Sequence, residues 1–153
     1  LSEGGNEKGR DCFRRFYERI EKAYGLSRGQ FPGEFEGVEK IYSDFYRRYQ
    51  GDVGHYFRTL YNLIKLVDQS VVEDKSFYTN LVRAQLSNQE TLLLFYNCSC
   101  GLGREKFKPL VEKYALLKNM PVDRLLSKSH VNWFEAGAYG KDAELGALSG
   151  KAG

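Results

Sequence analysis

The sequence contains few cysteines, and their spacing matches neither a disulfide framework nor a metal site. Only Cys12, Cys98 and Cys100 occur among the 153 residues, an odd number without a CxxC pair or a histidine cluster beside them. An odd, small number of cysteines is typical of free thiols in a reducing compartment. A structural zinc site needs four Cys or His ligands. The sequence therefore predicts a cytoplasmic protein that binds no metal.

Long apolar runs and prolines are scarce as well. The longest uninterrupted apolar run, residues 92–96, is far shorter than the roughly 18 residues of a membrane span, so we expect no membrane-crossing helix. The GxxxxGK[ST] phosphate loop, the dinucleotide glycine fingerprint and the GxSxG nucleophile motif are absent too, and we expect no cofactor. The three prolines leave long stretches free to be helical, because proline interrupts helices.

The charge is close to balanced, with 23 Lys and Arg against 20 Asp and Glu and a net charge of +3. This excess permits contact with nucleic acid or an anionic surface, but a dedicated duplex-binding protein carries a larger one. Hydrophobic residues make up 42% and charged residues 28% of the chain, the composition of an ordinary globular domain. The 11 Tyr and 10 Phe residues provide bulky rings for its core.

Apolar residues recur at intervals of three and four residues through most of the chain, which predicts an all-α fold. We expect Asp52 to cap the third helix, and Ser87 and Glu90 to form a capping box between two helices or at a kink. The helix after Ser87 is apolar on nearly every side, so it should lie at the centre of a compact bundle. The expected helices span about residues 10–24, 36–49, 53–69, 75–86, 88–100 and 104–118, with one short helix within 121–130.

Composition divides the chain into three parts. Residues 1–8 are polar and glycine-rich, which predicts a disordered segment. Residues 135–153 contain five glycines and little hydrophobic periodicity, which predicts a flexible tail. The helical domain then covers residues 9–134.

Polar residues on the third expected helix share one face. They follow one another at offsets of three and four residues: His55, Arg58, Asn62, Lys65 and Gln69. Such a row is most often a solvated surface. The alternative is that it lines a cleft, in which His55 acts as a general acid or base and Arg58 holds a phosphate.

A second polar group lies at the junction of the fourth and fifth expected helices. Arg83 and Gln85 stand there among apolar residues, and a guanidinium in such surroundings needs a partner. Arg83 either pairs with a nearby carboxylate such as Glu90, or it joins His55 and Arg58 around an anionic ligand.

An amide interrupts the apolar run of the fifth expected helix at Asn97. A buried amide has to form hydrogen bonds, so it either holds neighbouring backbone or lines a pocket. With this residue the candidate binding set is complete: His55, Arg58, Asn62, Arg83, Gln85 and Asn97.

Arg124 and His130 have the spacing of the Arg and His pair in HEPN-type ribonucleases, which this short segment resembles. The resemblance implies phosphodiester cleavage, usually at a dimer interface. Leu125 stands where that family has a polar residue, which departs from its pattern. The catalytic candidates of this alternative are His55 or His130 as acid and base, with Arg58, Arg83 or Arg124 as the phosphate clamp.

The chain resembles the AbiC-like family of phage abortive infection proteins in three segments: GHYFRTLYNLIKL (54–66), RAQLSNQETLLLFYN (83–97) and KFKPLVEKYALLKNM (106–120). With the short matches at 8–10 and 129–130, the resemblance covers about residues 9–130. It implies a role in bacterial defence, in which an infected cell stops growing or dies before the phage matures. It also implies hydrophobic helices upstream that tether the parent protein to a membrane.

The resemblance leaves three mechanisms open for this defence effector or sensor domain. The first is a binding module that recognises a phage protein, a host protein or a nucleic acid through its polar residues. The second is the helical ribonuclease. The third is a structural or oligomerisation domain, in which the partner is a further copy of the chain.

Overall fold

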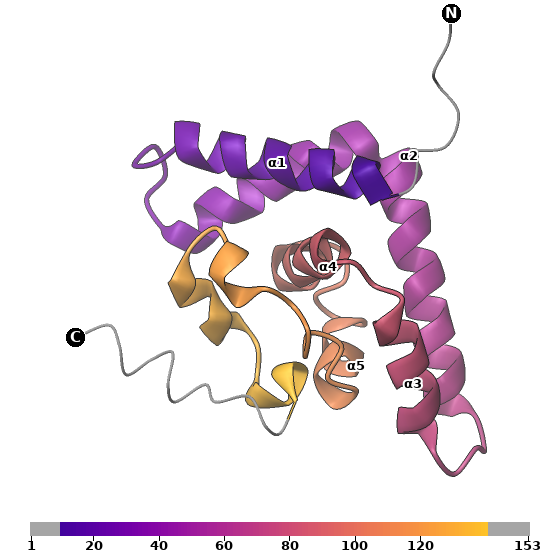
Figure 1. The fold of residues 1–153 in the computed structure, drawn as a ribbon. Coiled ribbons are helices and arrows are strands. Elements are labelled where there is room, and N and C mark those ends of the chain that lie inside the picture. The colour runs from indigo at the N-terminus through magenta and orange to yellow at the C-terminus, as the bar shows by residue number, and fades with distance from the viewer. Residues whose placement is uncertain (1–9, 141–153) are drawn as a thin grey trace, which may run out of the picture.

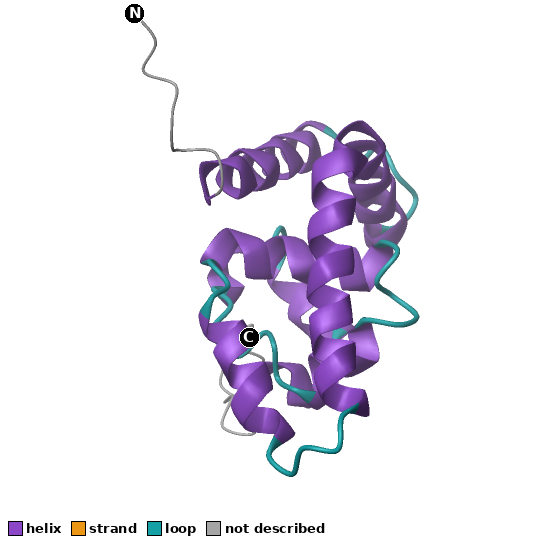
Figure 2. Cartoon of the chain, turned by 90° about the vertical axis from the view of Figure 1, so that its right-hand side faces the viewer, coloured by secondary structure: helices purple, strands orange, loops and turns teal. Residues whose placement is uncertain are grey.

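The computed structural model describes residues 10–140, and within this range the chain is helical without a strand. The all-α fold expected from the sequence is confirmed, and no helix of this range is long and apolar enough to cross a membrane. The predicted disordered segment 1–8 and residues 141–153 of the predicted tail lie outside the described residues. Figures 1 and 2 show the helices, which in chain order are α1 (Arg10–Leu26), α2 (Glu34–Gln69), α3 (Lys75–Ala84), α4 (Asn88–Cys100) and α5 (Lys108–Lys113), followed by the short 3-10 helices η1 (Val122–Arg124), η2 (Lys128–Trp133) and η3 (Ala136–Tyr139).

Helix α4 lies at the centre of the bundle, as predicted. Every residue from Thr91 to Ser99 is buried, and α1 and α2 both pack against this helix (Figure 1). It begins with the predicted capping box, in which the Glu90 N–H donates to Ser87 Oγ (3.2 Å) and the Ser87 N–H donates to Glu90 Oε2 (2.6 Å). These bonds satisfy amides that the start of a helix otherwise leaves unpaired.

Two predictions about the region of helix α2 are wrong. The second and third expected helices form one helix of 36 residues, and Asp52 is an exposed residue inside it rather than an N-cap. The predicted break is a kink at Tyr49, whose backbone leaves helical geometry (φ −116°, ψ 15°). Gly51 and Gly54 follow closely, and glycine-containing turns are common sites of helix kinks. Because of the kink, the first half of α2 runs along α1 and its second half runs along α3 (Figure 1).

Helix α5 is shorter than predicted and spans Lys108–Lys113 instead of residues 104–118. Pro109 stands in its first turn, the position at which the missing N–H costs least. Ala115 then adopts a left-handed backbone with φ of 50°, which ends the helical geometry. The single short helix expected within 121–130 is also replaced, by η1 and η2.

The segment after Glu135 is folded up to residue 140, which corrects the prediction that a flexible tail begins at residue 135. Helix η3 packs against α5, with Ala138 and Tyr139 buried. The Leu117 N–H donates to the Ala138 carbonyl (3.0 Å). A 3-10 helix of four residues is too short to produce a visible apolar period in the sequence.

Leu93→Ala tests the central position of α4. Leu93 has an exposed fraction of 0%, and its truncation leaves a cavity that should lower the free energy of unfolding by about 2–5 kcal/mol. Leu66→Ala makes the same chemical change on α2, where the side chain is 68% exposed, so we expect a change within roughly 0.5 kcal/mol. Urea unfolding followed by circular dichroism measures both. Equal losses in the two variants would contradict the buried position of Leu93.

Candidate functional site

The polar residues singled out by the sequence lie in several places. His55, Asn62 and Gln85 are exposed. Arg58 and Asn97, in contrast, line one cavity between α2 and the turn that follows α4, which we call the α2–α4 cavity. Two of the six candidate binding residues therefore meet at one place.

The α2–α4 cavity has a volume of about 210 Å³. All three segments that resemble abortive infection proteins contribute to it. The first supplies Gly54, Phe57, Arg58 and Tyr61, the second supplies Asn97, the third supplies Lys106 and Phe107, and Tyr46, Leu102 and Gly103 complete the lining. The fold thus brings together residues that are far apart in the sequence.

Two glycines keep this cavity open. A Cβ atom on Gly54 would lie 2.7 Å from the Tyr46 hydroxyl oxygen, and one on Gly103 would lie 2.7 Å from Asn97 Nδ2. Both distances are well below the roughly 3.5–4.0 Å of a favourable contact between heavy atoms. A side chain at either position would therefore displace the cavity wall.

Asn97 is held in place through its side chain and its backbone. Its Oδ1 accepts a hydrogen bond from the Tyr42 hydroxyl (2.9 Å), and its carbonyl accepts from the N–H groups of Gly101 and Gly103 (3.1 Å each). Asn97 therefore ends α4 and places an amide at the cavity wall. The side-chain amide thus lines the cavity and bonds to a tyrosine hydroxyl, and the backbone of the turn is held by the main-chain carbonyl instead.

The charged residues of the cavity are all positive. Arg58 and Lys106 are exposed, and no Asp or Glu lines the cavity. Neither cation forms an ion pair with another residue of the described range. Phe57, Tyr61 and Phe107 form apolar walls, while the two cations stay exposed to solvent. The arrangement can hold one anionic group.

Arg83 is bonded elsewhere in the fold. Its Nη1 donates to the carbonyl of Ala115 (3.3 Å), the left-handed residue after α5, and its buried Nε has no hydrogen-bond partner among the described residues. Neither the pairing with Glu90 nor a hydrogen bond or ion pair with His55 or Arg58 occurs in this range. Neither Arg83 nor His55 is among the residues that line the α2–α4 cavity with Arg58.

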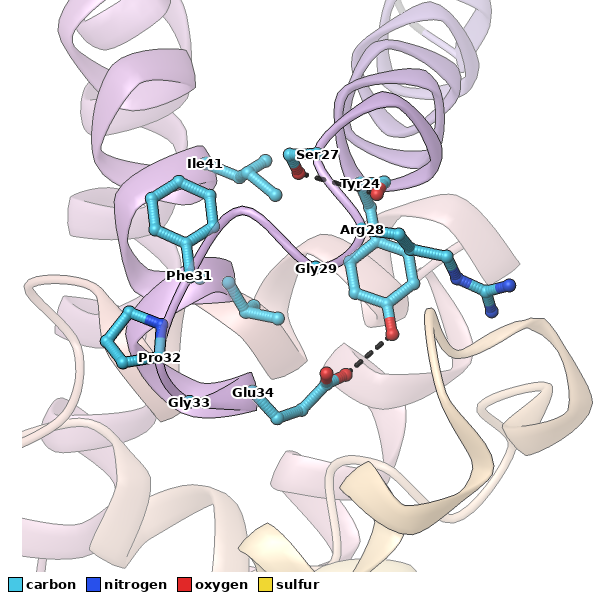
Figure 3. A pocket seen from close by; sticks show the side chains of 11 residues that line it. Tyr24, Ser27, Arg28, Gly29, Phe31, Pro32, Gly33, Glu34 and Ile41 are labelled. Atoms are coloured by element: carbon cyan, nitrogen blue, oxygen red, sulfur yellow. Dashed lines mark hydrogen bonds between the residues drawn. The ribbon is translucent and has the colours of Figure 1, made fainter.

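A second cavity, of about 400 Å³, lies where the loop after α1 meets the start of α2. Figure 3 shows the Tyr24 hydroxyl pointing at Glu34, to which it donates at 2.6 Å, while the Arg28 guanidinium points away from this carboxylate. Phe31 and Pro32 form another part of the wall. The carboxylate of this larger cavity is thus already bonded to the protein itself.

A fully buried histidine also binds Glu34. His130 has an exposed fraction of 0% and stacks on Trp133, with ring centroids 3.9 Å apart. Its Nε2–H donates to Glu34 Oε1 (2.8 Å), since an ionised carboxylate can only accept. Its Nδ1 accepts from the Tyr96 hydroxyl (2.9 Å), whose oxygen accepts from the Leu126 N–H (2.9 Å). Both ring nitrogens are therefore used inside the protein.

These bonds leave the Arg124 and His130 pair without an acid–base group. A buried imidazole with both nitrogens bonded cannot reach the proton of a substrate. The Arg124 guanidinium is directed to Glu21 (3.3 Å), and its backbone carbonyl accepts from the Tyr17 hydroxyl (2.6 Å). The ribonuclease alternative thus has no catalytic pair at these two positions.

Burial controls the titration of the groups around α4. It lowers the pKa of His130 from the ordinary 6.5, although the hydrogen bond to Glu34 opposes this shift. The hydrogen bond from Tyr24 lowers the pKa of Glu34 below its ordinary 4.5. Burial raises the pKa of Cys100 to about 12 and raises that of Cys98 as well, so both thiols stay protonated and unreactive near neutral pH. Within residues 10–140 no three His, Cys, Asp or Glu side chains are grouped as metal ligands.

Reasoning from the sequence missed Lys106, Gly54 and Glu34. Lys106 and Gly54 lie inside the segments that carry the family resemblance, so that similarity was the signal available for them. Glu34 had no such signal, because its partner His130 lies 96 residues away in the chain.

Comparison with known proteins points to a family. A family model described as putative phage abortive infection protein matches residues 48–125, just over half of the chain. The matched range contains the three similar segments and nine of the ten cavity residues, all except Tyr46. It is shorter than the range of about 9–130 expected from the sequence. No curated protein and no solved structure matches the chain.

The lowered pKa of His130 predicts that acid destabilises the protein. Below the ordinary pKa of 6.5 the unfolded chain takes up a proton that the folded chain still excludes, so unfolding becomes more favourable as the pH falls. One proton corresponds to at most about 1.4 kcal/mol per pH unit. We therefore expect the free energy of unfolding to fall between pH 6.5 and the lower folded pKa, and His130→Gln to flatten this slope.

The matched control is His55→Gln, because His55 is exposed and is the second of the two histidines. This variant should keep the slope of the wild type in urea titrations at a series of pH values. The imidazole signals of wild-type protein in NMR provide an independent measurement, in which His130 should titrate below 6.5. An unchanged slope in His130→Gln, or titration of His130 at or above 6.5, would refute the assignment.

Proposed function

Since this chain belongs to the family of putative phage abortive infection proteins, we propose that it acts in anti-phage defence by binding a partner. The bound group is an acidic side chain of a phage or host protein, and the α2–α4 cavity holds it. The chain is then a binding module of a defence system rather than a ribonuclease.

One observation carries this proposal: the three family-like segments meet around a cavity whose charged residues are all cations. Arg58 comes from the first segment and Lys106 from the third, while Asn97 of the second provides an amide. A guanidinium matches the planar geometry of a carboxylate and can bind it through two parallel hydrogen bonds. Residues that serve only to fill a core would have no need of two unpaired cations at one opening.

The size of the cavity favours a single side chain over a free cofactor. Pockets that enclose small-molecule ligands usually measure about 300–1,000 Å³, whereas this cavity measures about 210 Å³. Nucleic acid is also a poorer fit, because nucleic-acid binding rests on many phosphate contacts and a pronounced basic surface. Two cations around apolar walls suit one carboxylate on a folded partner.

Charge removal at the cavity tests this function in cells. Arg58→Ala and Lys106→Ala in the full-length protein should each weaken binding by about 10- to 100-fold, the effect of losing a charge-assisted hydrogen bond of roughly 1.5–3 kcal/mol. Phage plaque counts on bacteria that express the variants should rise accordingly. Both side chains are exposed, so thermal unfolding of the purified proteins should stay close to that of the wild type.

Arg14→Ala is the matched control, because Arg14 is an exposed arginine on α1 outside the cavity. It should protect against phage as the wild type does. Full protection by both cavity variants would refute the proposed site. Degradation of cellular RNA by the purified protein, abolished by His55→Ala, would support the ribonuclease alternative instead.

A further inference from the structure

A basic groove runs between α1 and the first half of α2, next to the cavity at the loop after α1, with which it shares Ser27, Phe31 and Ile41. It has a volume of about 500 Å³, and its floor is apolar, with the half-buried Ala23 and the exposed Leu26 above the buried Ile20, Ile41 and Phe45. Its rim carries the cations Arg19, Lys22, Lys40 and Arg48. We call these residues the α1–α2 groove. An apolar floor between charged rims is the usual surface on which an amphipathic helix docks.

The rim of this groove keeps an excess of positive charge. Its one carboxylate, Asp44, is already bonded to Lys40 (2.7 Å). Arg19 and Arg48 both lie against the ring of Tyr49, each 5.6 Å from its centroid, and neither pairs with an acid in the described part of the chain. The groove therefore favours an occupant that presents both apolar and acidic groups.

Helix α3 offers such an occupant. Phe77, Tyr78 and Leu81 are 55%, 45% and 52% exposed, and their spacing places them on the outer side of the helix, away from the buried Thr79. Glu73 and Asp74 are exposed just before the helix begins. We call these five exposed residues the α3 face. Large apolar side chains gathered at the surface in this way mark an interaction site.

The two surfaces match in length but cannot meet within one molecule. Helix α3 has 10 residues and is therefore roughly 15 Å long. The wall of the groove on α2, residues 40–49, is also 10 residues long. In Figure 1 the loop after α1 and the loop before α3 lie at opposite ends of α2. The length of this helix keeps the groove and the α3 face of one molecule apart.

We propose that the α3 face of one copy docks into the α1–α2 groove of a second copy. Phe77, Tyr78 and Leu81 then cover the apolar floor, while Glu73 and Asp74 approach the basic rim. The contact is heterologous, because two different surfaces meet. Each pair of copies retains one free groove and one free α3 face, so assembly continues beyond a dimer into a ring or a chain.

Two variants, each with one damaged surface, test this arrangement. Leu81→Asp places a charge on the α3 face, and the double variant Lys22→Glu, Arg48→Glu reverses charge at the groove. Light scattering after size-exclusion chromatography should show the wild type growing in mass beyond a dimer as its concentration rises. Each variant alone should be monomeric. An equal mixture of the two should form a dimer and nothing larger, because only one intact groove and one intact α3 face remain to meet.

A control with Arg14→Glu and Lys128→Glu reverses the same number of charges at exposed positions outside the groove, and it should assemble as the wild type does. Circular dichroism of all variants should show unchanged helix content, because every substituted side chain is exposed. A groove variant that still assembles, while Leu81→Asp does not, would mean that α3 faces pair with each other and would overturn the proposal. A wild type that stays monomeric at high concentration, or a mixture without dimers, would overturn it too.

Discussion

Helix α4 is surrounded by protein, so each polar group that it carries has to find a partner inside the bundle. An unpaired buried group would cost about 1–3 kcal/mol, a large share of the stability of a small domain. Ser99 Oγ solves this locally by donating to the Phe95 carbonyl (2.7 Å). Asn97 and Tyr96 instead bond to other elements, Asn97 to Tyr42 on α2 and Tyr96 to His130 in η2. These two long-range bonds tie α2 and η2 to the central helix.

The features of α4 that depend only on neighbouring residues could be predicted from the sequence. The bounds of α4, its capping box and its central place all follow from patterns within a few residues, namely an apolar run after Ser87 and Glu90. The apolar stripe of α1 is equally local. The need of the buried Asn97 amide for a hydrogen bond was also within reach, but its partner, the Tyr42 hydroxyl, was not.

The remaining features depend on contacts that no local pattern reveals. Asp52 is a good capping residue, but the helix passes through it, because capping preference is weaker than the packing of both halves of α2 against the bundle. Arg83 looked like half of an ion pair, yet its partner is a backbone carbonyl 32 residues away. At the α2–α4 cavity, the sequence predicted Arg58 and Asn97 but placed them with His55 and Arg83. Which polar residues share a cavity depends on how helices cross, and helical spacing alone does not determine it.

The bond from His130 to Glu34 has a consequence for how the protein can be divided. It joins the start of α2 to the C-terminal 3-10 segment, and through Tyr96 it joins both to α4. A fragment trimmed to the matched range 48–125 would lose Glu34, His130 and all of α1. Its central helix would then lose the apolar cover of α1 and both protein partners of the Tyr96 hydroxyl. The matched middle therefore depends on residues 10–47 and 126–140 to cover its central helix.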